Sequence, residues 1–147
     1  MVYITKSAEE TKQIGYKLAE KIDTGAIQTK FIAMRGEMGV GKTAFVAGFA
    51  SYFGITGVKS PTYAVMNQHT AKSGKKILHL DTYRIADEDD LYSIGFYDYL
   101  DGGDIMLVEW SENIEYAIPT GALYVEISRV DGDEDSRKIT ISEDISK

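Results

Sequence analysis

Two patterns of apolar residues along the chain predict alternating strands and helices. Residues 30–34 (KFIAM) and 105–110 (IMLVEW) are short and mostly apolar, as strands buried in the middle of a sheet are. Ile14, Leu18 and Ile22 instead recur at every fourth position, which is typical of a helix with one buried face. The chain therefore mixes buried strands with amphipathic helices.

The first two predicted helices have recognisable ends. Ser7 and Glu10 form an S-x-x-E capping box at the start of the first helix, and Gly25 is expected to stop it. The second helix is predicted over residues 43–53, with Gly54 as its stop. Both helices are long enough to cover one face of a sheet.

The remaining segments complete a prediction for the whole fold. A third helix, acidic at its start, is predicted over residues 87–100. Further strands are predicted over residues 2–5, 63–69, 77–83, 122–130 and 137–141. Two pairs of these strands form hairpins, one of them joined by the acidic turn 131–135, and hairpins require antiparallel neighbours. We predict an α/β fold of three layers, with a mixed parallel and antiparallel central sheet, in a single domain over residues 1–147.

Composition and charge restrict the classes of function. The chain has no cysteine, which removes disulfides, thiolate nucleophiles and cysteine-based zinc sites, and which fits a reducing cytoplasm. Its net charge is −7, whereas nucleic-acid binders usually present a basic surface. Its one basic cluster, Lys72, Lys75 and Lys76 around Gly74, is interpreted as an exposed hairpin turn. Any RNA is therefore expected to be held by a partner protein.

The apolar runs are too short for a membrane protein. None approaches the roughly 20 residues that span a bilayer, and the first residues lack the pattern of a secretory signal. We expect a cytoplasmic protein that does not contact a membrane.

The strongest motif is the segment GEMGVGKT, residues 36–43, which matches the P-loop pattern G-x4-GK[ST] between a predicted strand and a predicted helix. Gly39 and Gly41 leave room for a phosphate, and the backbone N–H groups of the loop and of the helix start point at it. Lys42 then reaches the outer phosphates, and the hydroxyl of Thr43 is a ligand for Mg²⁺. The motif predicts a P-loop NTPase fold that binds a nucleotide and Mg²⁺.

A P-loop also needs a carboxylate at the end of a neighbouring buried strand, and two candidates exist. Glu109 follows a purely apolar run, where a charge needs a functional reason. Asp81 follows the strand-like run ILHL, but it could instead cap the end of that strand or pair with Arg84. One carboxylate would hold the metal or its water, and the other would position the attacking water.

Two further features have both a functional and a structural interpretation. The segment Ser60-Pro61-Thr62-Tyr63 lies where many nucleotide hydrolases keep a loop that senses the outermost phosphate, but it could also be a simple entry into a strand. His69 and His79 lie on adjacent predicted hairpin strands, and we considered them as a metal pair for which no third ligand is evident.

Five blocks in order resemble the TsaE family, formerly called YjeE: GEMGVGKT, SPTYAVMNQH, HLDTYRI, GFYDYL and IMLVEW. Members of this family are small bacterial P-loop ATPases needed to make threonylcarbamoyladenosine on tRNAs that read codons starting with A. The resemblance covers nearly the whole chain. It implies a Mg²⁺-dependent ATPase, weak alone, that docks on a TsaD–TsaB heterodimer and meets tRNA only through these partners.

The resemblance also implies roles for individual residues. Thr43 and Glu109 would be the Mg²⁺ ligands, and Asp81 would act near the metal water or the hydrolytic water. Lys42 would be catalytic together with the two carboxylates. The residues that would contact ATP are Thr11, near the base, Glu37, Met38, Gly39, Val40, Gly41, Lys42 and Thr43 in the loop, and Ser60 and Thr62 in the switch-like segment.

Three positions depart from the family pattern: Thr82 stands where Leu is usual, Ala64 where Thr is common, and Glu37 where Asp is usual. None is expected to touch a phosphate or a metal ligand.

Two other functions remain open. A small-molecule kinase would use the same loop but usually has an arginine-rich lid, which is not evident here. An ATP-gated switch with negligible hydrolysis has the same sequence signature, whereas the absence of an N-K-x-D block argues against GTP.

Overall fold

The computed structural model describes residues 1–37, 40–58, 66–102 and 104–143, and their strands form one sheet. The strands are β1 (Val2–Thr5), β2 (Phe31–Arg35), β3 (Met66–Thr70), β4 (Lys76–Asp81), β5 (Ile105–Glu109), β6 (Leu123–Val130) and β7 (Asp133–Ser142). The helices are α1 (Ala8–Asp23), α2 (Lys42–Tyr52), α3 (Glu88–Ser93), α4 (Phe96–Asp101) and the 3₁₀ helix η1 (Ser111–Ala117).

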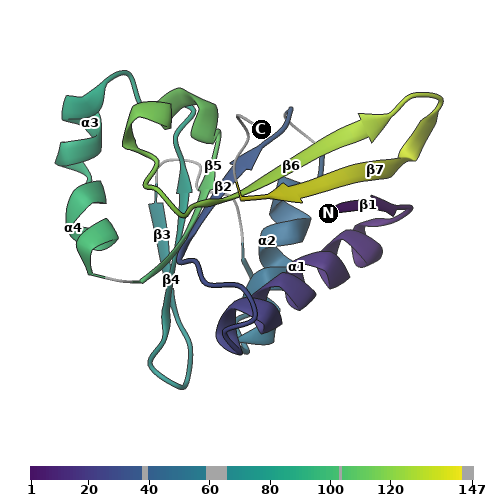
Figure 1. Cartoon of the computed structure of the whole chain (residues 1–147), viewed down its shortest axis with the longest axis horizontal. Helices are drawn as coiled ribbons and strands as arrows, with labels where there is room; N and C mark the ends of the chain where they lie inside the picture. The colour runs from purple at the N-terminus through teal and green to yellow at the C-terminus, as the bar shows by residue number, and fades with distance from the viewer. Residues whose placement is uncertain (38–39, 59–65, 103, 144–147) are drawn as a thin grey trace.

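The sheet is mixed, as the sequence predicts. Its strand order is β1-β7-β6-β2-β5-β4-β3. The four central strands β6, β2, β5 and β4 are parallel to one another, whereas the hairpins β3–β4 and β6–β7 and the pair β1–β7 are antiparallel. Figure 1 shows the β6–β7 hairpin extending away from the other strands, with β1 beside it.

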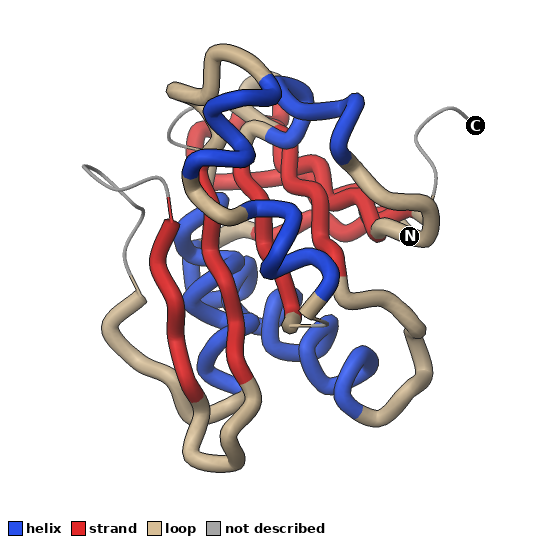
Figure 2. The backbone as a smooth tube through the Cα atoms, turned by 90° about the vertical axis from the view of Figure 1, so that its left-hand side faces the viewer, coloured by secondary structure: helices blue, strands red, loops and turns tan. Residues whose placement is uncertain are grey.

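Helices cover both faces of the sheet and make a three-layer molecule. Side chains alternate along β2, because successive residues of a strand point to opposite faces. Ile32 and Met34 pack with α1 and α2, whereas Phe31 and Ala33 pack with α3, α4 and η1. Figures 1 and 2 show the strands between these two groups of helices. None of the described helices is long and apolar enough to cross a membrane.

Two glycines let α1 and α2 lie in backbone contact. A Cβ atom on Gly15 would lie 2.2 Å from the carbonyl oxygen of Phe45, and one on Gly48 would lie 2.0 Å from that of Lys12. No real Cβ atom tolerates such distances, so only glycine fits at these positions. Because α2 follows the P-loop sequence, this contact fixes the position of that helix against α1.

The predicted ends of the first helix agree with the structure. The side chain of Ser7 accepts a hydrogen bond from the backbone N–H of Glu10 at 3.2 Å, which is the bond of an N-cap. At the other end Gly25 follows the helix with a φ of 82°, in the left-handed region that favours glycine.

Two predictions about the second half of the chain were wrong, and one helix was missed. The helix predicted over residues 87–100 is two short helices, α3 and α4, because Gly95 between them has a φ of 80° and ends the first. Strand β7 begins at Asp133, with the tight turn at Gly132 (φ 82°), so the acidic turn is shorter than residues 131–135. The helix η1 was not predicted at all.

Candidate functional site

The P-loop sequence and both candidate carboxylates meet at one edge of the sheet. Strands β2, β5 and β4 are parallel neighbours, so their carboxyl ends lie at the same edge. Asp81 and Glu109 are paired across β4 and β5, and the loop leaves the sheet directly after Arg35 of β2. Ligands of open α/β sheets bind at this edge.

Glycines shape both ends of the described part of the loop. Gly36 has a φ of 143°, and a Cβ atom there would lie 2.5 Å from the carbonyl oxygen of Ile127 in β6. Gly41 has a φ of 105° and caps α2, but no described atom lies within 4 Å of where its Cβ would be. Gly36 is therefore required by packing against the sheet, whereas the space beside Gly41 is open to a ligand.

Lys42 is the buried cation of the site. Its side chain is the first of α2, only 5% of the residue is exposed, and its ammonium donates to the carbonyl oxygen of Gly36 at 2.7 Å. The same nitrogen lies 4.3 Å from the centre of the Trp110 ring, a cation–π distance. Burial lowers the pKa of Lys42, and the negative charge of Glu109 is the largest influence that opposes this shift.

Glu109 is buried and has a partner that the sequence analysis did not assign to it. Only 4% of the residue is exposed, and its Oε2 atom lies within hydrogen-bond distance of Nε2 of His79, which is fully buried in β4. The sequence analysis considered His79 only as half of a metal pair with His69. The alternation of Ile77, His79 and Asp81 along β4 places His79 on the same face as Asp81. This pattern in the sequence could have assigned His79 to the candidate site.

Asp81 is half-buried and caps the end of its own strand. Its Oδ1 atom accepts a hydrogen bond from the backbone N–H of Tyr83 at 3.0 Å, which is the capping alternative that the sequence analysis left open. Arg84 is exposed and forms no ion pair with a described residue. The second oxygen of Asp81 faces no described hydrogen-bond donor and is available at the edge of the sheet.

Thr82 corrects one expectation from the sequence. Its buried hydroxyl lies 2.9 Å from the backbone carbonyl oxygen of Glu109 and 2.7 Å from that of Trp110. It therefore touches the backbone of a candidate metal ligand, although we expected this departure from the family pattern to lie away from such residues. Trp110 has a φ of 58°, which is uncommon for a residue other than glycine, and the Thr82 hydroxyl stabilises the chain at this bend.

Two arginines from the β6–β7 hairpin hold the loop from its other side, and sequence reasoning missed both. Nε of Arg137 donates to the carbonyl oxygen of Val40 at 3.0 Å, and Nη1 of Arg129 lies 2.9 Å from Oε2 of Glu37. The Glu37 side chain is otherwise exposed. No local pattern links these residues, because roughly a hundred positions separate them along the chain.

The remaining predicted site residues lie partly outside the described chain. Met38, Gly39, Ser60 and Thr62 are not among the described residues. Thr11 is buried in α1, and its hydroxyl shares a 2.8 Å hydrogen bond with that of Thr5. The side chain of Val40 is buried in the core between α2 and the sheet, so only its backbone can face a ligand. Thr43 occupies the second position of α2.

The donor set fits a polyphosphate and a hard divalent cation. The first N–H groups of α2 have no partner within the helix, and anions bind at such helix starts. Carboxylate and hydroxyl oxygens are ligands that suit Mg²⁺, and Glu109, Asp81 and Thr43 supply them. Within the described chain, no group of three or more His, Asp or Glu residues could hold a metal ion by itself. The phosphates would therefore complete the coordination, as in other P-loop sites.

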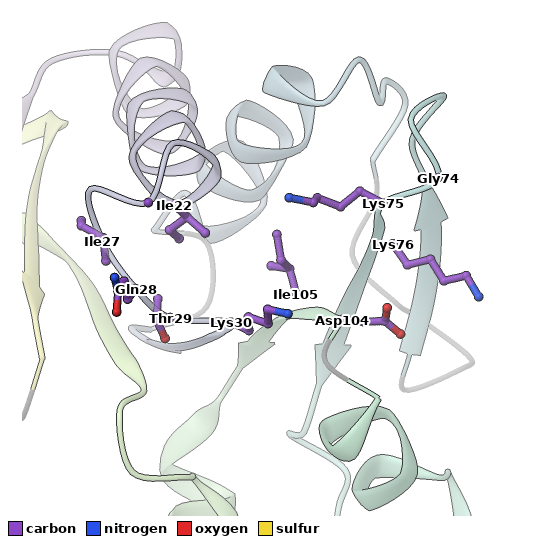
Figure 3. Close-up of a pocket in the computed structure, with 11 residues that line it drawn as sticks. Ile22, Ile27, Gln28, Thr29, Lys30, Gly74, Lys75, Lys76, Asp104 and Ile105 are labelled. Carbon is purple, nitrogen blue, oxygen red and sulfur yellow. The ribbon is translucent and has the colours of Figure 1, made fainter.

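A separate cavity of about 560 Å³ lies at the opposite edge of the sheet, where β2 and β5 begin. It lies between the segment after α1 and the turn of the β3–β4 hairpin, and Ile22 and Ile105 contribute apolar surface (Figure 3). Lys75 at its rim pairs with Asp23 at 3.0 Å. Lys72, Lys75 and Lys76 are all exposed here, which confirms the predicted exposed turn.

Comparisons with known proteins agree on one family. Residues 5–139 match the family model described as "Threonylcarbamoyl adenosine biosynthesis protein TsaE". A protein of Bacillus subtilis named tRNA threonylcarbamoyladenosine biosynthesis protein TsaE is 35% identical over 94% of this chain and 82% of its own length. The protein of the same name from Haemophilus influenzae is 36% identical over 75% of this chain and 68% of its own length. The crystal structure of Bacillus subtilis YdiB superposes with a TM-score of 0.74 at 28% identity, over 96% of this chain and 83% of that one.

Proposed function

This chain belongs to the TsaE family of threonylcarbamoyl adenosine biosynthesis proteins and has a P-loop NTPase fold, and we propose that it is a Mg²⁺-dependent ATPase acting in that tRNA modification. The observation that carries the proposal is the buried ammonium of Lys42, held beside the buried carboxylate of Glu109 at the loop edge of the sheet. A buried lysine whose pKa is shifted by burial and by a specific charge partner is typical of a functional site.

Different groups of the site bind the phosphates, the metal ion and the lysine side chain. In the proposed complex the loop N–H groups and the start of α2 bind the phosphate oxygens, and Lys42 exchanges its bond to the Gly36 carbonyl for one to the outer phosphates. Thr43 and Glu109 would hold Mg²⁺, which would supply positive charge against the charge on the phosphates. Trp110 covers one side of Lys42 and keeps water from its ammonium.

Asp81 is the proposed group for the attacking water. It lies beside Glu109 across the β4–β5 pair, and its Oδ1 atom is held by the backbone N–H of Tyr83. This bond fixes the carboxylate, while its other oxygen accepts a hydrogen bond from the water. Phosphoryl transfer depends mostly on such positioning and on electrostatic stabilisation, so a partner protein can raise the rate by completing the site.

The distribution of charge supports a protein partner rather than direct binding of RNA. Residues 85–128 contain no lysine, arginine or histidine but almost half of the 23 aspartates and glutamates of the chain. This stretch includes α3, α4 and η1, which pack on one face of the central strands. An RNA backbone would be repelled there. We therefore propose that the protein works in the cytoplasm on a TsaD–TsaB complex and meets tRNA only through it.

The test is ATP hydrolysis by the purified protein, alone and with TsaD and TsaB. Lys42→Ala is the test variant, and Lys76→Ala, an exposed lysine at the opposite edge of the sheet, is the matched control. We expect slow hydrolysis alone, a clear rise with the partners, loss of both in Lys42→Ala and normal rates in Lys76→Ala. Fast hydrolysis that ignores the partners, or ATP binding without hydrolysis under either condition, would favour a kinase or a passive switch instead.

A further inference from the structure

Among the described residues, His79 is the one fully buried ionisable side chain at the candidate site to which the proposed function assigns no role. It lies in the middle of β4, and its side chain points to the same face of the sheet as that of Glu109 on the neighbouring strand. In the register of the two parallel strands His79 is opposite Leu107, so Glu109 is its diagonal neighbour. From there Nε2 reaches Oε2 of Glu109 within hydrogen-bond distance.

The chemistry of this contact defines which ring nitrogen carries hydrogen. A carboxylate that binds a metal ion is ionised and can only accept hydrogen bonds, so with Glu109 as a Mg²⁺ ligand Nε2 of His79 is the donor. The other ring nitrogen, Nδ1, is buried and has no hydrogen-bond partner among the described residues. The contact through Nε2 is therefore the one hydrogen bond that orients the ring among the described residues.

We propose that His79 is a positioning residue that orients the carboxylate of Glu109 toward Mg²⁺. By binding Oε2 it leaves Oε1 as the oxygen for the metal and stops the carboxylate from rotating. Groups that hydrogen-bond to a metal ligand commonly change metal affinity about 10- to 100-fold when removed. The inference rests on the proposed function, because it takes Glu109 to be a Mg²⁺ ligand.

A purely structural role for His79 makes a different prediction. If the ring only filled space, a leucine of similar size would replace it with little effect on the metal. If the hydrogen bond matters, a glutamine should replace it better than a leucine, because the glutamine amide is also a donor. His69 offers a matched control, since it lies on the neighbouring strand β3 and its buried Nε2 also lacks a hydrogen-bond partner among the described residues.

The experiment measures Mg²⁺ affinity without measuring catalysis. Trp110 is the only tryptophan of the chain and lies against Lys42, so its fluorescence reports binding at the site. Each protein is saturated with a non-hydrolysable ATP analogue and titrated with Mg²⁺. We compare the wild type with His79→Leu, His79→Gln and the control His69→Leu.

The expected result is a rise of about 10- to 100-fold in the half-saturating Mg²⁺ concentration for His79→Leu. His79→Gln and His69→Leu should stay near the wild-type value, and all four proteins should bind the analogue equally well without Mg²⁺. An unchanged Mg²⁺ affinity in His79→Leu, or equal losses in the Leu and Gln variants, would overturn the proposal.

Nitrogen NMR of the wild-type ring keeps the proposal testable if His79→Leu does not fold. Hydrogen on Nε2, with a signal that moves when Mg²⁺ is added to the analogue complex, is the expected result. Hydrogen on Nδ1 alone, or a signal that ignores Mg²⁺, would overturn it. If the proposed function itself is wrong, the wild type will bind the analogue without any response to Mg²⁺. That result would refute both the Mg²⁺ site and the role of His79.

Discussion

Replacing Gly48 by alanine tests whether the close contact of α1 and α2 determines where the P-loop helix lies. The new Cβ atom would lie 2.0 Å from the carbonyl oxygen of Lys12 and 2.6 Å from its carbonyl carbon. Ordinary contacts between carbon and oxygen are about 3.3 Å or longer, so the two helices must separate by roughly 1.3 Å. Both partners are backbone atoms, which a change of side-chain rotamer cannot move.

The expected loss of stability follows from two opposing effects. Overpacking a core contact typically costs about 1–3 kcal/mol, and the short distance here places Gly48→Ala at the upper end of that range. Alanine regains up to about 1 kcal/mol, because its helix propensity exceeds that of glycine. The net expectation is a loss of about 2 kcal/mol, or roughly 4–8 °C in melting temperature for a chain of this size.

Thermal and urea unfolding followed by circular dichroism measure this loss. The control is Ala47→Gly, which changes the same helix by about 1 kcal/mol through propensity alone and creates no clash. Gly15→Ala, with its Cβ atom 2.2 Å from the carbonyl oxygen of Phe45, should behave like Gly48→Ala. The double variant should lose less than the sum of the two, because one separation of the helices relieves both clashes. A melting temperature of Gly48→Ala equal to or above the wild-type value would refute this account of the interface.

Three further predictions concern the loop, the bend after β5 and the first helix. Arg137→Ala removes the donor to the Val40 carbonyl, at 3.0 Å, and should weaken nucleotide binding several-fold in a Trp110 fluorescence titration. The control Arg84→Ala should bind the nucleotide as tightly as the wild type. Equal affinities for both variants and the wild type would contradict the role of Arg137. Thr82→Val removes the one hydroxyl hydrogen that the carbonyl oxygens of Glu109 and Trp110 share, and both carbonyl groups keep a backbone N–H donor. It should lower the free energy of unfolding in urea by about 1 kcal/mol, whereas an unchanged midpoint would mean that water replaces the bond. Ser7→Ala removes the N-cap of α1 and should cost about 1 kcal/mol in the same assay, and a stability equal to that of the wild type would show that the cap contributes nothing.

Local patterns in the sequence predicted most of the framework because the responsible forces act over a few residues. The apolar run before Glu109 needed no partner to be recognised as a buried strand, and the Ser7 cap acts within its own first turn. The P-loop pattern likewise implied a strand before it and a helix after it, and both are present. The split at Gly95 was missed because a glycine within a helical pattern can either lie inside a continuous helix or end it.

Contacts between segments far apart in the sequence could not be predicted from local patterns. The bond from Arg137 to the Val40 carbonyl depends on how the β6–β7 hairpin lies against the loop. The contact of His79 with Glu109 depends on β4 and β5 being neighbours in one particular register, and a shift of one residue would turn His79 to the other face of the sheet. Sequence therefore located the reactive groups of the candidate site better than it located the groups that hold them.

The burial of Glu109 connects these supporting contacts to the proposed function. A buried carboxylate is unfavourable unless hydrogen bonds or nearby charges compensate for the loss of water. Here His79 lies within hydrogen-bond distance of the carboxylate, and the positive charge of Lys42 is nearby. When Lys42 turns to the phosphates in the proposed complex, Glu109 loses part of this compensation at the moment when Mg²⁺ is available to replace it. Binding of the nucleotide and of Mg²⁺ should therefore be cooperative, and Lys42→Ala should weaken the dependence of each on the other as well as the affinity for both.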